Sequence, residues 1–101
     1  MNITISEKDG KLVAALCGDL NNVASMQAER ELAPVFERTD CDVVIDCTEL
    51  DYISSSGLRI LLRIYKHTRS SSHKAILKGL KEDVKEVFQL SGFMSLFVQE
   101  P

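Results

Sequence analysis

Residues 43–62 read VVIDCTELDYISSSGLRILL, and this stretch decides the fold. The apolar, β-branched run at 41–47 predicts a central strand covered on both faces. Apolar residues between 58 and 65 predict a helix packed on the sheet. The serine-rich turn at 54–57 joins the two, and a strand followed by a packed helix is the repeating unit of α/β folds.

The segments before this stretch predict a hairpin and a helix. Residues 3–6 and 11–17 flank the turn signal Asp9-Gly10 and predict an antiparallel pair of strands. Residues 21–37 predict an amphipathic helix, capped by Asn21 or Asn22 and kinked or broken near Pro34. The apolar positions of this helix are Val23, Met26, Leu32, Val35 and Phe36.

The segments after it continue the alternation of strands and helices. A polar connection at 67–73 leads to a strand at 74–79, a helix at 81–90 that ends at Ser91-Gly92, and a last strand at 93–98. Strands separated by helices pair in parallel through right-handed crossovers. We therefore predict one α/β domain over 1–101, with a mixed, mostly parallel sheet, an N-terminal hairpin and helices packed on the sheet.

Composition and charge narrow the range of functions. The chain has 101 residues, 45% hydrophobic and 27% charged, which suits one globular domain. A net charge of −3 provides no basic surface for nucleic acid. The first residues lack the pattern of a signal peptide, and every apolar run is too short to span a bilayer. We expect a cytoplasmic protein that neither binds nucleic acid directly nor inserts into a membrane.

The cysteines and histidines predict no metal site, cofactor or disulfide framework. Cys17, Cys41 and Cys47 lack a Cys-x-x-Cys spacing and stand among strand-forming residues, so we interpret them as small core residues. His67 and His73 flank a polar loop and have no cysteine at ligand spacing, which indicates surface histidines.

The best candidate for a functional site is the turn Ser54-Ser55-Ser56-Gly57. Functional groups of α/β sheets collect at the carboxyl ends of strands, where the sequence also places Asp19, Asn21, Asp46 and Thr48. A serine at a helix amino terminus lies beside unpaired N–H groups and the positive end of the helix dipole, which favours a phosphate. Spacing alone favours a simple helix cap. Gly57 would allow close approach of another backbone or a partner.

Other chemistries fit the sequence less well. Gly-x-Ser-x-Gly is absent and no histidine is placed as a base, so a serine hydrolase is not expected, and both glycine-rich nucleotide loops are missing. Asp46 invites comparison with the phospho-accepting aspartate of a response-regulator receiver domain. Such a domain needs an acidic pair after its first strand, and this sequence lacks that pair. We interpret Asp46 as an acceptor for the following turn and Asp51 as a turn residue.

Three segments together resemble the STAS domain of bacterial anti-sigma factor antagonists. They are Gly18-Asp19-Leu20-Asn21, the strand and turn from Val43 to Leu62, and the closing segment from Val84 to Phe93. The most specific part is an aspartate-ended strand, a Leu-x-x-Ile step and a Ser-Ser-Gly-Leu turn into a helix. The resemblance covers nearly the whole chain.

The resemblance implies a non-enzymatic switch controlled by phosphorylation. The dephosphorylated antagonist binds an anti-sigma factor that is also a serine kinase, and a phosphoserine phosphatase reverses the modification. The motif carries the phosphoacceptor onto Ser55, with Ser56 and Ser54 as second choices. The implied partner-binding residues are Asp19, Asn21, Ser54, Ser56, Gly57, Leu58 and Arg59. The chain departs from the family at Ser54, often aspartate, at Asn21, often acidic, and at Arg59, often glycine.

One alternative stays open at this point. STAS domains also serve as non-catalytic subunits of lipid-transport ABC complexes, in which the turn would be only a helix cap. Copurification with an ATPase and a permease would select that function.

Overall fold

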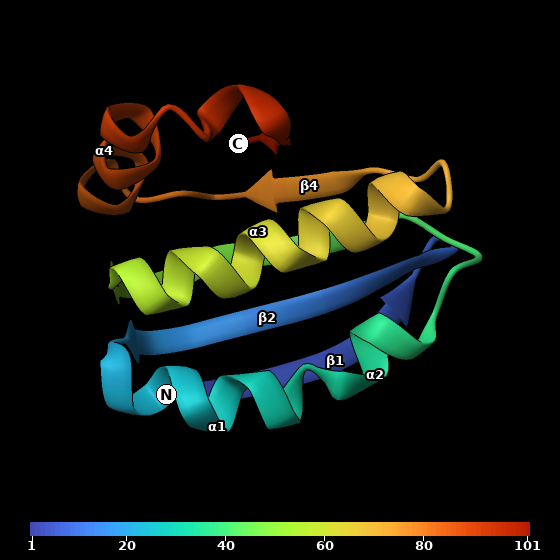
Figure 1. The fold of residues 1–101 in the computed structure, drawn as a ribbon, viewed down its shortest axis with the longest axis horizontal. Coiled ribbons are helices and arrows are strands. Elements are labelled where there is room, and N and C mark those ends of the chain that lie inside the picture. Colours follow the sequence, from blue (N-terminus) through green and yellow to red (C-terminus); the bar gives the residue numbers. More distant parts are fainter.

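The computed structural model describes all residues, 1–101, and contains one five-stranded sheet with its strands in chain order (Figure 1). β1 (Asn2–Lys8) and β2 (Lys11–Leu20) form an antiparallel hairpin. β3 (Val43–Ile53), β4 (Ala75–Lys78) and β5 (Val98–Glu100) add to it in parallel. The predicted fold class, a mixed and mostly parallel sheet that begins with a hairpin, is confirmed.

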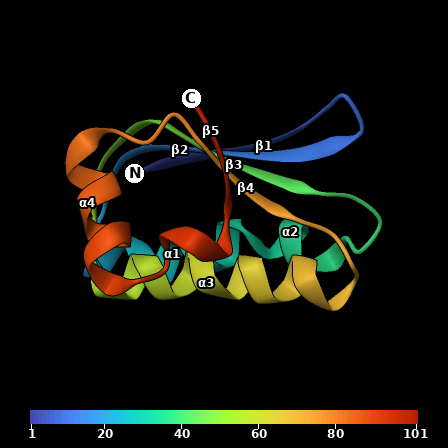
Figure 2. The same ribbon diagram turned by 90° about the horizontal axis from the view of Figure 1, so that it is seen from above.

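The helices lie on one side of the sheet (Figure 2). The predicted helix at 21–37 is broken at Leu32, and Pro34 occupies the first turn of the second piece, where its missing N–H costs no hydrogen bond. The predicted irregularity at Pro34 is therefore confirmed. The four helices are α1 (Asn22–Glu31), α2 (Ala33–Glu37), α3 (Ser55–Ser70) and α4 (Glu82–Ser91).

The buried face of α1 differs from the prediction. Val23 and Met26 are 82% and 69% exposed, although their helical spacing predicted both on the apolar face. The buried positions are instead Ser25 and Ala28, followed by Leu32 and Val35 at the same spacing of three and four residues. Small side chains at 25 and 28 allow α1 to pack closely, and this leaves the larger Val23 and Met26 facing solvent.

β3 also differs from the expected strand. It runs to Ile53, six residues beyond the predicted end, because its second half pairs with the end of β2 after a register shift. Helices cover only one of its faces. On the other face Val44 is nevertheless buried, since Val13 and Ile76 flank it in register on the neighbouring strands. The strand was expected to be covered on both faces. Helices cover one face, whereas on the other face Val44 is buried by the side chains of the neighbouring strands alone.

Three smaller predictions need correction. Cys17 is exposed because it alternates with the buried Leu16 along β2, whereas Cys41 and Cys47 are buried as predicted. α3 continues to Ser70, so His67 belongs to a helix rather than to a loop. The predicted strand at 93–98 is a short 3-10 helix, Met94–Leu96, followed by β5.

The histidines are half-buried and have partners inside the chain, so they are not free surface histidines. The Nε2 atom of His67 contacts the carbonyl oxygen of Arg38. The Nδ1 atom of His73 lies 3.2 Å from Asp42 Oδ1, which also accepts a hydrogen bond from the N–H of Lys74. These contacts tie the ends of α3 and β4 to the segment before β3.

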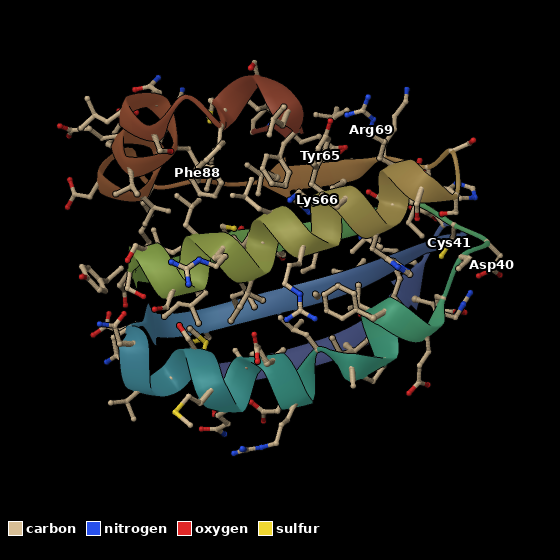
Figure 3. All side chains as sticks on the ribbon, viewed as in Figure 1. Asp40, Cys41, Tyr65, Lys66, Arg69 and Phe88 are labelled. Carbon is tan, nitrogen blue, oxygen red and sulfur yellow. The ribbon has the colours of Figure 1, made fainter.

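The C-terminal segment is held by aromatic packing. Phe88 is fully buried between α4 and α3 (Figure 3). Its ring meets Phe97 edge to face, with centroids 5.7 Å apart, and Phe97 also contacts Tyr65 of α3. Phe97 therefore points into the core, between the 3-10 helix Met94–Leu96 and β5.

Candidate functional site

The turn between β3 and α3 is built around Ser54. Its N–H donates to the carbonyl oxygen of Leu20 at 2.9 Å, which joins the turn to the end of β2. Its Oγ accepts a hydrogen bond from the N–H of Gly57 at 3.1 Å, and its carbonyl oxygen accepts one from the N–H of Leu58. Ser54 is only 7% exposed. The first serine of the turn is therefore the N-cap of α3.

Loss of this cap should destabilise the fold, whereas removal of either of the other two serine hydroxyls should have little effect. We expect Ser54→Ala to lower the free energy of unfolding by about 1 kcal/mol, because the N–H of Gly57 then loses its acceptor in a buried place. Ser55→Ala and Ser56→Ala should each change it by less than about 0.5 kcal/mol. Urea unfolding followed by circular dichroism measures all three, and equal values for the three variants would contradict the assigned cap.

Ser55 is the exposed hydroxyl of the turn. Its side chain makes no hydrogen bond within the chain, and Ser56 beside it is half-buried. The N–H groups of Ser55 and Ser56 precede the first helical hydrogen bond of α3 and have no acceptor in the protein. An accessible hydroxyl thus lies next to two free donors at the positive end of a 16-residue helix.

Gly57 and Leu58 are buried under this turn. A Cβ at Gly57 would lie 2.6 Å from Leu20 Cγ and 2.9 Å from the Leu20 carbonyl oxygen. The close approach expected at Gly57 is therefore made by β2 of the same chain. Of the predicted partner-binding residues, Ser54, Gly57 and Leu58 are inaccessible in this structure because they form the inner side of the turn.

Of the remaining predicted residues, Asp19, Asn21 and Arg59 are exposed and Ser56 is half-buried. Asp19 lies near the end of β2, and Asn21 caps α1 by accepting a hydrogen bond from the N–H of Ala24 at 2.8 Å. Arg59 lies one helical turn after Ser55 and forms no ion pair with any residue of the chain. The turn brings Ser55, Ser56 and Arg59 together on the first turns of α3, beside the start of α1.

Sequence reasoning missed the apolar part of this surface. Tyr52 is 53% exposed at the end of β3, and Val23 and Met26 are exposed on the first turns of α1. An available signal was the competing stripe of Ser25, Ala28 and Leu32, whose spacing leaves Val23 and Met26 outside the buried face. Tyr52 therefore lies on the strand that leads into the serine turn, and Val23 and Met26 lie on the helix α1.

Asp46 and Asp51 have structural partners. Thr48 donates to Asp46 Oδ1 from Oγ1 at 2.6 Å and from its N–H at 3.1 Å, as predicted, although both residues lie in β3. Partial burial works to raise the pKa of Asp46, but these hydrogen bonds outweigh it and lower the pKa. Asp51, predicted in a turn, lies in β3 and pairs with Lys81, whose pKa is raised by that hydrogen bond.

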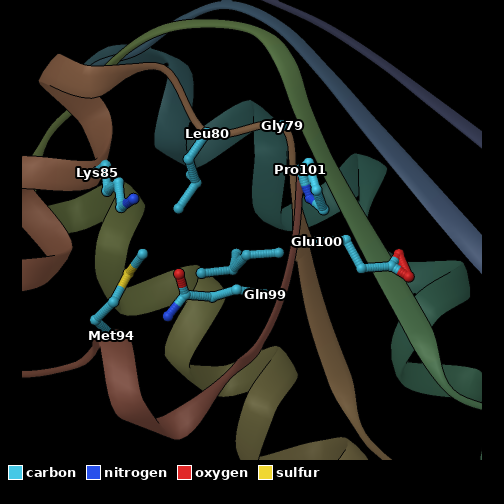
Figure 4. A pocket seen from close by; sticks show the side chains of 8 residues that line it. Gly79, Leu80, Lys85, Met94, Gln99, Glu100 and Pro101 are labelled. Atoms are coloured by element: carbon cyan, nitrogen blue, oxygen red, sulfur yellow. The ribbon is translucent and has the colours of Figure 1, made fainter.

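Other sites on the molecule offer less chemistry. Burial raises the pKa of Cys47 to about 12, which keeps this thiol protonated and unreactive. No group of three or more His, Cys, Asp or Glu side chains is arranged to hold a metal ion. A hollow beside α4 and the last residues of the chain is lined by Leu77, Gly79, Leu80, Lys85, Met94, Gln99, Glu100 and Pro101, with no residue of α1 or α3 (Figure 4). No helix is both long and apolar enough to cross a membrane.

Comparison with known proteins agrees with this architecture. The chain matches the STAS domain family over residues 2–100. BtrV of Bordetella bronchiseptica, named provisionally as an anti-sigma factor antagonist, is 42% identical over 97 residues, which are 96% of this chain and 84% of BtrV. The chain therefore belongs to the STAS domain family, as its sequence motifs predicted.

Solved structures of anti-sigma factor antagonists share the fold. One from Mycobacterium paratuberculosis matches with a TM-score of 0.84 at 20% identity, over 99% of this chain and 85% of that one. The Bacillus cell fate determinant SpoIIAA matches in its unphosphorylated form with a TM-score of 0.79 at 20% identity, over 97% and 87% of the two chains. Its phosphorylated form matches with a TM-score of 0.73 at 18% identity, over 97% and 90%.

Proposed function

We propose that this protein is an anti-sigma factor antagonist that acts as a phosphorylation-controlled partner switch in the cytoplasm. Unphosphorylated, it binds an anti-sigma factor that is also a serine kinase and so releases a sigma factor for transcription. Phosphorylation of Ser55 ends the complex, and a phosphoserine phosphatase restores it. The observation that carries the proposal is the exposed Ser55 hydroxyl beside two free N–H groups, next to a serine that is already used as the cap.

The modification is a phosphoryl transfer performed by the partner. The Ser55 oxygen forms a bond to the γ-phosphorus of ATP, the bond from that phosphorus to the bridging oxygen breaks, and ADP leaves. A base on the kinase takes the hydroxyl proton. The protein itself contributes an accessible acceptor and an amino terminus of α3 that tolerates the new negative charge. Its own role is regulatory, and it needs no catalytic group or cofactor.

The names of the relatives support the antagonist function, and the SpoIIAA pair supports a switch that keeps the fold. Both the unphosphorylated and the phosphorylated form of SpoIIAA match this chain over 97% of its length. A modification at an exposed helix terminus requires no large rearrangement, since the added charge acts directly on the contact surface.

Pull-down of the full chain followed by mass spectrometry tests the partner. We expect an ATP-binding anti-sigma factor to be recovered. Recovery of an ATPase together with a permease, and of no such kinase, would favour a subunit of a transport complex instead.

Incubation with that kinase and ATP tests the acceptor. We expect complete loss of phosphate incorporation in Ser55→Ala and incorporation as in the wild type in Ser56→Ala, because Ser55 alone among the three serines of the turn is exposed. Intact-protein mass spectrometry counts the phosphates and peptide mapping locates them. Undiminished phosphorylation of Ser55→Ala would refute the assigned site.

A further inference from the structure

A shallow groove runs between α1 and α3 beside the serine turn. On α3, Ser56, Arg59 and Arg63 follow one another at spacings of three and four residues, so they form one stripe that faces α1. The groove is lined by Asn22, Ser25, Met26, Glu29, Ser56, Arg59, Ile60 and Arg63.

The two arginines of the groove differ in what they already bind. Arg63 donates to Glu29 Oε1 at 2.9 Å and lies over the ring of Phe36, 5.1 Å from its centroid. Arg59 is exposed and forms no ion pair. The groove therefore presents one free guanidinium, which prefers a carboxylate or a phosphate in bidentate geometry.

One exposed apolar side chain borders this free charge. Met26 lines the groove and is 69% exposed, whereas Val23, one helical turn earlier, lines a separate hollow with Gly18 and Asp19. An exposed large apolar side chain beside an unpaired charge is typical of protein contacts. A segment that covers Met26 and places a carboxylate against Arg59 would match the groove in both shape and charge.

Arg59 also lies four residues after Ser55 on the same helix. Side chains at this spacing are neighbours on the helix surface, so a phosphate on Ser55 is within reach of the Arg59 guanidinium. The phosphate would carry about −1.5 to −2 charges at neutral pH, so it would compete strongly with a carboxylate of a partner for the Arg59 guanidinium.

We propose that the α1–α3 groove is a docking surface for an acidic residue of the anti-sigma factor, that Arg59 binds this carboxylate, and that phosphate on Ser55 withdraws Arg59 from it. This inference rests on the proposed function. It names Arg59 as the residue through which phosphorylation of Ser55 weakens partner binding, in addition to the general repulsion by the added negative charge.

Calorimetric titration of the unphosphorylated full chain with its anti-sigma factor tests the docking. We expect Arg59→Ala to weaken binding by about tenfold, the size of one charge-assisted hydrogen bond, and Arg59→Lys to weaken it less. Met26→Ser should also weaken it. Arg69→Ala is the matched control, an exposed arginine near the other end of α3 (Figure 3), and should change affinity by less than about twofold.

Phosphorus NMR of the protein phosphorylated on Ser55 tests the capture of Arg59 without the partner. The phosphoserine pKa should be lower in the wild type and in Arg69→Ala than in Arg59→Ala, because the guanidinium stabilises the dianion. Equal phosphoserine pKa values in wild type and Arg59→Ala would overturn the capture.

The outcomes separate this inference from the proposed function. If Ser55 phosphorylation still controls binding while Arg59→Ala binds like the wild type, the groove proposal fails alone. If no kinase binds or modifies Ser55, both fail. A concentration-dependent dimer that Met26→Ser abolishes, seen by sedimentation, would assign the groove to a second copy of the chain and overturn the proposal.

Discussion

Gly57→Ala should lower the free energy of unfolding by about 3 kcal/mol, although alanine normally stabilises a helix relative to glycine by about 1 kcal/mol. The added methyl would meet Leu20 Cγ at 2.6 Å and the Leu20 carbonyl oxygen at 2.9 Å. The same carbonyl accepts the N–H of Ser54, so α3 cannot move away without straining the hydrogen bond that ties the turn to β2. Chemical denaturation measures the loss.

A double-mutant cycle identifies the cause of this loss. Leu20→Ala removes two of the three close contacts. The double variant should therefore lose less free energy of unfolding than the two single variants lose together, by about 1 kcal/mol or more. Ser56→Ala is the matched control, since it adds no atoms at the neighbouring helical position. A Gly57→Ala protein as stable as Ser56→Ala would show that Leu20 moves aside at little cost.

The alternation of strands and helices could be predicted because the strongest patterns coincide with buried elements. The apolar run at 43–45 and the helix from Leu58 to Ile64 are both in the core. The second half of β3 was missed because Glu49, Asp51 and Tyr52 are exposed and show no strand pattern. Backbone pairing with the end of β2, after a register shift, holds this part, and side-chain periodicity does not reveal such pairing.

The candidate site was located from sequence, but the division of roles inside it was not. Ser54, Ser55 and Ser56 are chemically identical, and only the geometry makes Ser54 the buried cap and leaves Ser55 exposed. The exposure of Val23 and Met26 likewise depends on which side of α1 packs against its neighbours. Such assignments require the tertiary contacts, because local spacing permits more than one solution.

Phosphorylation of Ser55 should weaken binding to the anti-sigma factor by about 100-fold, or about 2.7 kcal/mol. The phosphate would add up to two negative charges and a hydration shell to the exposed hydroxyl of Ser55, one helical turn before Arg59 and three residues after the exposed Tyr52. A partner that covers this surface would have to strip water from the new charge and face like-charge repulsion from its own acidic groups. Competition titrations with purified unphosphorylated and phosphorylated protein give the ratio.

Substitutions separate the charge of the phosphate from other effects of the modification. Ser55→Glu carries one charge instead of two and should lose about tenfold in affinity, whereas Ser55→Ala should bind within about twofold of the wild type. Ser70→Glu is the matched control, because it adds the same charge at an exposed serine at the other end of α3 and should leave binding within about twofold of the wild type. Treatment of the phosphorylated protein with a phosphatase should restore full affinity, since we expect the added charge to act on the contact surface and to leave the fold intact. Equal affinities of the phosphorylated protein and Ser55→Ala would mean that the Ser55 surface lies outside the contact with the anti-sigma factor, and the switch would then have to act elsewhere.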